Sequence, residues 1–433
     1  MRRKAYEIVY GVLEGQRNSD VILHQILEQV SGVQDKKFIK RLAYGAVEHA
    51  VEADAYIRHF SHTSIGRMDP SVRTVLRMAL YEILYMDAVP KAVSCHEAVA
   101  LLKNVGGQRY AGFVNGVLRS ILRGRDEVVL RPWEEICLPK NLYAYMVDRY
   151  GKKTVRKMAM AFLERGTEVT IHIDRNKISC EQYEASLKKE NIRYRQGSYF
   201  KEVYIVRHVE DVKNLPGYED GWFFVQDESS MLPVLCAGVK PGDTVIDVCA
   251  APGGKTMHAL MQMKGQGILS YRDVSEKKLS RIRENLQRFG YTNTEGKVWD
   301  GTKTDDDWSG KADVLLADVP CSGLGIIGKK PEIRYRALQE VDTLVPIQRR
   351  ICEASAGLLR RGGVFLYSTC TICEKENEEN VSWLERNCGL QRESLDPFLP
   401  ERLQNKMTAE GMLQILPGVH ESDGFFVARL RKE

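Results

Sequence analysis

The chain has 433 residues, of which 43% are hydrophobic and 28% are charged. These are ordinary values for globular proteins, so they exclude disordered, collagen-like and disulfide-scaffold classes. No apolar run approaches the ~18 residues that cross a bilayer, and Glu7 and Glu14 interrupt the apolar segment that a signal peptide would need. We therefore expect a cytoplasmic protein of about two to four domains that does not bind membranes.

The net charge of +5 is unevenly distributed along the chain. Residues 1–125 contain 18 Lys and Arg against 12 Asp and Glu, whereas residues 126–433 contain 45 against 46. A basic segment of this kind favours an anionic partner, and nucleic acid is the common one. The alternative is a solvated helical surface with no partner. The candidates for phosphate contacts are the basic residues Arg2, Arg3, Lys4, Arg73, Arg77, Arg109, Arg119 and Arg123.

Residues 1–125 have the periodicity of α-helices. Asp69 and Pro70 mark a helix start, because Asp serves as an N-cap and Pro fits the first helical position. The apolar residues that follow recur on one helical face: Val72, Val75, Leu76, Ala79, Leu80, Ile83 and Leu84. Ser94 and Glu97 have the spacing of a capping box and predict another helix start. This segment therefore predicts an all-α helical bundle.

The pattern of the remaining residues predicts a linker and two further domains. Residues 126–160 are predicted to be a linker, because prolines interrupt regular structure there. Residues 161–238 combine β-like segments at 169–173 and 203–206 with a helix-like segment at 180–189, which predicts a small α+β subdomain. Residues 239–433 alternate strands and helices and end in a predicted hairpin. That alternation predicts a Rossmann-like, doubly wound α/β domain with a mainly parallel sheet.

A glycine-rich turn follows the first strand of the α/β domain, which we expect at residues 244–248. Small residues let a ligand approach the backbone, and the next helix offers free N–H groups. The triplet from Gly254 to Thr256 matches the end of a phosphate-binding P-loop, but Cys249 stands where that motif needs glycine. An NTPase is therefore disfavoured. The remaining alternatives are S-adenosylmethionine and a plain strand–helix turn without a ligand.

Acidic residues after the next two predicted strands favour S-adenosylmethionine. Asp273 ends the second strand, where a ribose is expected, and Asp300 follows the third, near an adenine. Carboxylates suit this cationic ligand and would repel the phosphates of ATP. The expected cofactor-binding residues are Cys249, Ala250, Ala251, Pro252, Gly253, Gly254, Lys255, Asp273, Asp300 and Asp318.

Two further strand ends carry cysteines, Cys321 and Cys370, at the same predicted edge. A buried cysteine is commonly a small hydrophobic residue, but thiols beside a methyl donor suit methylation at C5 of a pyrimidine. A thiolate that adds to C6 makes C5 nucleophilic, and Asp318 is placed to protonate or hydrogen-bond N3. These residues leave open which cysteine attacks. Cys370 and Cys373 form a single C-x-x-C without a second pair, so we expect no metal.

The segments DVCAAPGGKT (247–256), ADVPCSGLG (317–325) and YSTCT (367–371) resemble motifs of the RNA 5-methylcytosine methyltransferase family, the RsmB/Sun group. Residues 225–233 and 423–432 also resemble that family, and residues 1–125 are similar to a NusB-type RNA-binding domain. Val319 departs from the usual alanine of the Pro-Cys motif, and Arg272 is atypical.

The resemblance implies methylation of C5 of a cytosine in 16S ribosomal RNA, dependent on S-adenosylmethionine and proceeding through a covalent cysteine–C6 adduct. It implies that Cys370 is the nucleophile, that Cys321 assists product release and that Asp318 lies between cofactor and base. The substrate is free ribosomal RNA or an assembling small subunit, and we expect a monomer. The alternative is a non-catalytic RNA-binding or ribosome-assembly factor that retains a methyltransferase fold.

Overall fold

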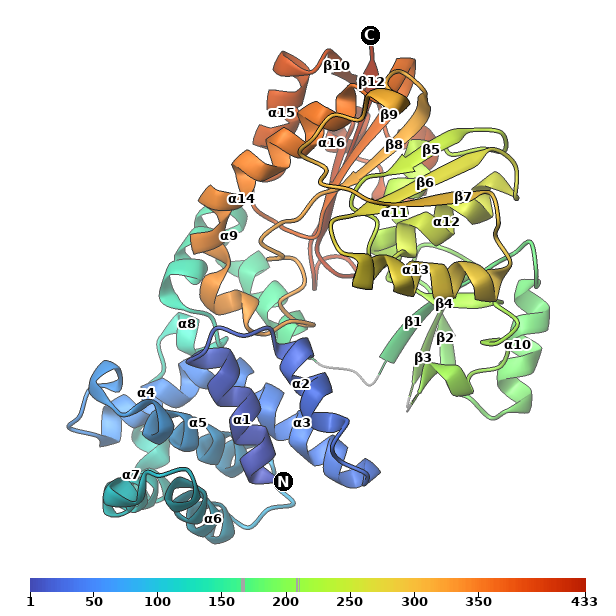
Figure 1. The fold of residues 1–433 in the computed structure, drawn as a ribbon. Coiled ribbons are helices and arrows are strands. Elements are labelled where there is room, and N and C mark those ends of the chain that lie inside the picture. Colours follow the sequence, from blue (N-terminus) through green and yellow to red (C-terminus); the bar gives the residue numbers. More distant parts are fainter. Residues whose placement is uncertain (165–167, 208, 210) are drawn as a thin grey trace. The chain divides into compact units, whose positions relative to one another are not determined.

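The computed structural model describes residues 1–164, 168–207, 209 and 211–433. The chain divides into two compact units (Figure 1). The N-terminal unit comprises Met1–Glu164 and Ile327–Arg336, and the C-terminal unit comprises Arg165–Ile326 and Ala337–Glu433. Within the described ranges, no helix is long and apolar enough to cross a membrane.

The N-terminal unit is built from helices, as its periodicity predicts. They are α1 (Arg2–Leu13), α2 (Ser19–Leu27), α3 (Val33–Glu48), α4 (Ala50–Phe60), α5 (Pro70–Tyr85), α6 (Lys91–Asn104), α7 (Ala111–Gly124), α8 (Pro132–Glu135) and α9 (Lys140–Leu163). Asp69 caps α5 by accepting a hydrogen bond from the Ser71 N–H. Apolar side chains of α1, α3, α5 and α7, such as Leu76 and Leu118, are fully buried in one core. The segment predicted as a linker contains α8 and α9, and the predicted domain boundaries stay predictions.

The predicted capping box at Ser94 is wrong. Helix α6 begins at Lys91, with Pro90 as its N-cap residue. Ser94 lies inside the helix, where its hydroxyl donates to Glu82 Oε2 at 3.2 Å, and Glu97 pairs with Arg2. The proline sets the helix start because its ring fixes φ and it has no N–H to donate. The spacing of Ser94 and Glu97 is therefore incidental.

The C-terminal unit begins with a small α+β subdomain. Its elements are β1 (Glu168–Ile173), α10 (Cys180–Lys189), β2 (Tyr194–Gln196), β3 (Val203–Arg207) and β4 (Phe223–Val225). The strands pair antiparallel in the order β2-β3-β1-β4. Tyr183 and Leu187 of α10 pack with Ile171 and Tyr204 of the sheet.

The larger part of the C-terminal unit is a mixed sheet with helices on both faces (Figure 1). Its elements are α11 (Glu228–Ala237), β5 (Thr244–Asp247), α12 (Gly254–Met263), β6 (Ile268–Asp273), α13 (Glu276–Phe289), β7 (Thr294–Val298), β8 (Ala312–Asp318), α14 (Ile333–Ala356), β9 (Leu359–Thr369), α15 (Glu378–Asn387), β10 (Leu390–Arg392), α16 (Lys406–Ala409), β11 (Met412–Ile415) and β12 (Phe425–Lys432). The strand order is β10-β12-β9-β8-β5-β6-β7, and β11 pairs with β12. Strands β5 to β9 are parallel, whereas β12 is antiparallel to β9.

Alternating residues of the parallel strands face opposite layers. Val245 packs in the cluster that holds α12 and α13, whereas Ile246 packs in the cluster that holds α14 and α15. This period of two, with apolar residues on both faces, is typical of a parallel sheet covered by helices. The predicted doubly wound α/β domain and its closing hairpin are confirmed.

The strand order places a topological switch point between β5 and β8. The chain runs from β5 outward through β6 and β7, then returns to β8 and β9 on the other side of β5. Ligands of open α/β sheets bind beyond the carboxyl ends of the strands at such a point. Here those ends carry Asp247, Asp318 and Thr369.

Candidate active site

The glycine-rich turn connects the end of β5 to the start of α12. Gly253, the N-cap residue of α12, has φ 106°, a conformation that strongly favours glycine. The Ala250 N–H donates to Arg272 O at 2.8 Å, and the Gly253 N–H donates to Ala250 O at 2.7 Å. The turn is therefore fixed to the end of β6, and the first N–H groups of α12 open toward the carboxyl edge of the sheet.

Asp247, immediately before the turn, has one carboxylate oxygen available to a ligand. Its Oδ2 accepts a hydrogen bond from Thr256 Oγ1 at 2.8 Å. Its Oδ1 is buried and has no hydrogen-bond partner among the residues that the structure describes. Burial raises the pKa of Asp247 to about 7. An unsatisfied buried acceptor of this kind fits a cationic ligand or its bound water. Asp247 is the first residue of the DVCAAPGGKT motif but was not among the predicted site residues.

The two acids predicted for the nucleoside differ in their surroundings. Asp273 ends β6, is 7% exposed, and accepts the Ser275 N–H at 3.1 Å. Asp300 is exposed two residues beyond β7, where hydrogen bonds from Thr302 lower its pKa. Asp273 thus fits a ribose hydroxyl pair at a strand end. Asp300 lies in the loop after the next strand, with its carboxylate already engaged by Thr302.

Cys249 lies in the turn as a neutral thiol. Burial and the neighbouring Asp247 raise its pKa. A protonated thiol is a weak nucleophile, so Cys249 lines the turn and does not itself attack a substrate. The small turn residues, the Asp247 oxygen and Asp273 together fit S-adenosylmethionine, which carries a cationic amino-acid part and an adenosine.

The structure brings Cys321 and Cys370 together. Cys321 follows β8, Cys370 follows β9, and their Sγ atoms are 3.3 Å apart. The Gly325 N–H donates to Cys370 O at 2.9 Å, and a Cβ at Gly325 would lie 2.2 Å from Gly424 O. Glycine at position 325 therefore lets the loop after β8 pack against the segments that contain Gly424 and Cys370. The hydrogen bond with Cys370, together with burial, raises the pKa of Cys321 well above its usual value.

Asp318, at the end of β8, contacts both the cofactor turn and strand β9. Lys255 Nζ is 2.6 Å from Asp318 Oδ2, and Ser368 Oγ donates to Oδ1 at 2.8 Å. The Lys255 ammonium also lies 5.1 Å from the centre of the Phe425 ring. Lys255, predicted only as part of the cofactor turn, thus contacts the carboxylate predicted to meet the base.

A buried polar network supports the cysteine loops. Glu376 is fully buried and accepts from the Ser322 N–H at 2.8 Å, from Ser322 Oγ, and from Gln348 Nε2 at 2.9 Å. Gln348 Nε2 also donates to Pro320 O at 2.9 Å. This network was not predicted, because Ser322, Gln348 and Glu376 come from three separate segments of the sequence. Helix α15 begins only at Glu378, and residues 374–377 form turns that carry Glu376 inward.

The two atypical residues of the sequence are explained by packing. Arg272 is 1% exposed, and its guanidinium lies 3.0 Å from Asp305 and 5.4 Å from the centre of the Trp308 ring. It therefore forms a buried ion pair within the sheet layer. Val319 is 3% exposed and packs in the core on the α14 face. Valine at this position fills apolar space and removes no reactive group.

The basic residues of the N-terminal unit fall into two groups. Arg2, Arg73 and Arg77 form ion pairs with Glu82, Glu14 and Asp54, respectively. Arg3, Arg109, Arg119 and Arg123 are exposed, and Arg3 and Arg109 also pair with Glu7 and Asp69 at the surface. Lys4 is half-buried and donates to Gln29 O. The first group stabilises the helical bundle, and the second group can reach an anionic partner.

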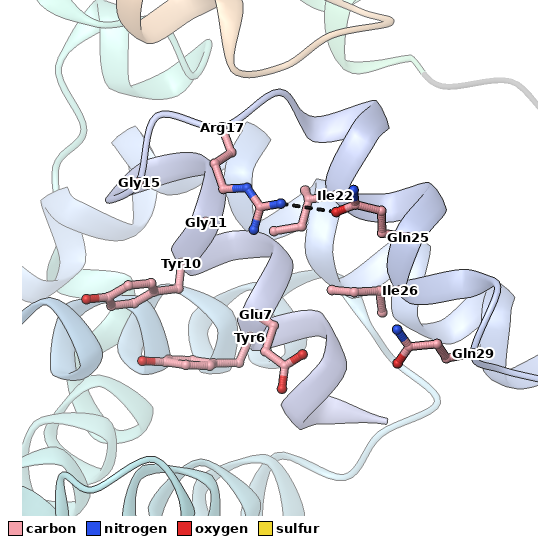
Figure 2. A pocket seen from close by; sticks show the side chains of 10 residues that line it. All are labelled: Tyr6, Glu7, Tyr10, Gly11, Gly15, Arg17, Ile22, Gln25, Ile26 and Gln29. Carbon is pink, nitrogen blue, oxygen red and sulfur yellow. Dashed lines mark hydrogen bonds between the residues drawn. The ribbon is translucent and has the colours of Figure 1, made fainter. Parts of the chain in front are cut away.

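The same unit has a surface pocket on α1 and α2 (Figure 2). Tyr6 and Tyr10 lie on one side with ring centroids 5.5 Å apart, and Arg17 donates to Gln25 at 3.1 Å on the other. None of the residues predicted for catalysis or for the cofactor lines it.

Two sequence families match this chain. The family described as 16S rRNA methyltransferase RsmB/F matches residues 235–431, and the NusB family matches residues 1–123. A probable ribosomal RNA small subunit methyltransferase B of Synechocystis is 29% identical, with 100% of this chain and 99% of that protein aligned. The protein of the same description from Bacillus subtilis is also 29% identical, again over 100% of this chain and 99% of the relative.

Solved structures share the fold. The crystal structure of PH0851 superposes with a TM-score of 0.81 at 22% identity, covering 99% of each chain. A methyltransferase homologue from Pyrococcus horikoshii gives a TM-score of 0.58 at 25% identity, covering 70% of this chain and 98% of that one. The match to methyltransferases, together with the glycine-rich turn after β5 that fits this ligand, identifies S-adenosylmethionine as the methyl donor. The chain therefore joins an N-terminal part that matches the NusB family to a C-terminal part that matches the RsmB/F methyltransferases.

Proposed function

We propose that this methyltransferase modifies C5 of a cytosine in 16S ribosomal RNA. The observation that carries the proposal is the pair of thiols, 3.3 Å apart, on the strand edge that also holds Asp318 and the cofactor turn. The relatives in Synechocystis and Bacillus subtilis, described as probable small subunit ribosomal RNA methyltransferases, support ribosomal RNA as the substrate.

The first step is activation of the base by Cys370. Its sulfur adds to C6 of cytosine, and the electron pair of the C5–C6 double bond moves toward C5. Asp318, held by Lys255 and Ser368, shares a proton with N3, and this proton offsets the negative charge that develops on the ring. S-Adenosylmethionine supplies the electrophilic methyl group that C5 acquires.

The second step is release of the methylated base. A water molecule accepts the C5 proton, the C5–C6 double bond re-forms, and the bond between Cys370 Sγ and C6 breaks. Cys321 is in position to assist this step, since its Sγ lies 3.3 Å from the departing sulfur. Its raised pKa keeps the Cys321 thiol protonated, so it can hydrogen-bond the departing thiolate and does not compete as the nucleophile.

The substrate must present an unstacked cytosine, because a stacked base hides C6 from the thiol. The NusB-family domain and the small α+β subdomain are proposed to grip the surrounding RNA. Both thiols, Asp318 and the cofactor turn come from one chain, which supports action as a monomer. A ribosomal RNA substrate is also in keeping with a cytoplasmic location.

Trapping with 5-fluorocytosine RNA tests the roles of the two cysteines. Fluorine at C5 prevents removal of the proton, so the bond between sulfur and C6 persists and a denaturation-resistant adduct accumulates. We expect adducts with the unmodified chain, with Cys321→Ala and with the control Cys388→Ala, and none with Cys370→Ala. An adduct formed by Cys370→Ala but not by Cys321→Ala would reverse the assignment.

A further inference from the structure

The N-terminal unit contains a cluster of side chains that the proposed methyl transfer does not use. His49 lies at the junction of α3 and α4, Glu52 lies in the first turn of α4, and Cys137 lies between α8 and α9. His49 Nδ1 is 2.8 Å from Glu52 Oε2 and 3.4 Å from Cys137 Sγ, and Cys137 Sγ is 3.9 Å from Glu52 Oε2. An imidazole nitrogen, a carboxylate oxygen and a sulfur thus converge on one point.

These separations are close to those around a tetrahedral zinc ion. Usual Zn–S, Zn–N and Zn–O distances place the donor atoms of such a site roughly 3.3–3.6 Å from one another. Shifts of about half an ångström would bring all three pairs to that spacing. The ligand set of one thiolate, one imidazole and one carboxylate suits Zn²⁺ better than the harder Mg²⁺ or Ca²⁺.

Neighbouring groups orient the three ligands. Tyr85 donates its hydroxyl proton to Glu52 Oε2 at 2.6 Å, and its ring lies 4.1 Å from that of His49. Cys137 has φ 54°, which is uncommon for a residue with a side chain, and Arg334 NH1 donates to its carbonyl at 3.1 Å. Such surrounding contacts are typical of metal sites, where they fix the donor atoms in position.

The local charges also favour a divalent cation. Glu48 and Glu52 are buried carboxylates, and Arg334 is the buried cation beside them. The two carboxylates outnumber the one cation, so an added divalent cation would offset the excess of negative charge.

We propose that His49, Glu52 and Cys137 form a zinc site with a water in the fourth position. The Cys137 thiol loses its proton to solvent as the sulfur–zinc bond forms. The side chains of His49 and Glu52 are 16% and 10% exposed, which gives the ion a path of entry. No metal was expected from the sequence, because Cys370 and Cys373 form a single C-x-x-C. Glu52 and Cys137 are 85 positions apart and form no spacing motif.

Cobalt binding tests the proposal in the full-length chain. Co²⁺ reports sulfur ligation through a near-ultraviolet charge-transfer band and tetrahedral geometry through its visible bands. All variants carry Cys321→Ala and Cys370→Ala, so that the proposed catalytic thiols do not contribute. After metal removal, we expect one Co²⁺ per chain with both sets of bands. Cys137→Ala should abolish the charge-transfer band, and the matched control Cys95→Ala, another buried thiol of this unit, should keep it.

A second readout covers the case in which Cys137→Ala fails to fold. Glu52→Gln should weaken Co²⁺ binding at least about tenfold, because it removes an anionic ligand. Zn²⁺ at about one hundred times its Kd should raise the Tm of the unmodified chain by roughly 5 °C or more. A charge-transfer band that survives Cys137→Ala, or a chain that shows neither bands nor a Tm shift, would overturn the zinc site.

Discussion

The residues at the strand edge act in pairs. Cys321 and Cys370 share a hydrogen bond, and Asp318 is held by Lys255. In the proposed mechanism, one member of each pair meets the base and the other sets its position or protonation. The sequence motifs identify these residues but not which of them contact each other. The contacts arise because the ends of β5, β8 and β9 lie side by side in the sheet.

Replacing Lys255 with methionine tests the Asp318 pair. Loss of the 2.6 Å contact frees the carboxylate to rotate, and misplacement of a catalytic group commonly costs about tenfold or more in rate. We expect single-turnover methyl transfer at saturating RNA to fall by at least about tenfold, with partial retention in Lys255→Arg. The control is Lys311→Met, an exposed lysine just before β8. An unchanged rate for Lys255→Met would show that the ion pair has no role in positioning.

The buried carboxyl of Asp247 predicts a pH dependence of stability. Its pKa rises from 3.8 to about 7 in the folded chain. The native state therefore retains a proton that the unfolded state releases, and stability falls as pH rises through that window. We expect urea unfolding to show a larger loss of stability between about pH 5 and about pH 8 for the unmodified chain than for Asp247→Asn. The exposed Asp307→Asn should behave like the unmodified chain, and equal pH dependence in Asp247→Asn would contradict this assignment.

At the scale of elements, the loops after β8 and β9 depend on the turn that carries Glu376. The strands and the glycine turn were predictable from the sequence, because apolar runs and small residues have local signatures. The buried polar network was not, since Ser322, Gln348 and Glu376 come from three segments and each is ordinary on a surface. Only the packed fold shows that their polar atoms satisfy one another.

Replacing Glu376 with alanine tests this support. Ser322 N and Gln348 Nε2 would lose a charged acceptor while buried, a change that typically costs about 2–4 kcal/mol. We expect that loss in the free energy of unfolding, measured in urea, together with loss of methyl transfer. Glu379→Ala, an exposed neighbour, should change stability by less than about 0.5 kcal/mol. Full activity in Glu376→Ala would mean that the loops hold their geometry without the network.

At the scale of the whole molecule, the excess of basic residues in the first 125 positions lies within the N-terminal helical unit. The class of each part was predictable, since helical periodicity and strand–helix alternation are strong signals over many residues. The sequence did not predict which basic residues form ion pairs within the protein and which are exposed. Arg73 and Arg77 are spaced like phosphate contacts, yet both pair with acidic residues of the helical bundle. Sequence spacing alone does not report such long-range ion pairs.

The exposed arginines of α7 predict a salt-dependent contribution to RNA binding. Arg119 and Arg123 are one turn apart and exposed, so they can contact neighbouring phosphates. We expect the double variant Arg119→Ala/Arg123→Ala to bind 16S ribosomal RNA several-fold more weakly and to reduce the salt slope of log K by about 1–2. An unchanged slope would assign phosphate binding to other surfaces, and the exposed Lys311→Ala serves as the control for charge removed outside this unit.

Bisulfite sequencing of 16S ribosomal RNA tests the proposed activity most directly. RNA is compared from cells that carry the gene, cells that lack it, and cells that carry only Cys370→Ala. The proposal predicts one cytosine that is protected from conversion with the intact gene and fully converted in the other two. Identical conversion patterns in all three, or protection that persists with Cys370→Ala, would contradict it.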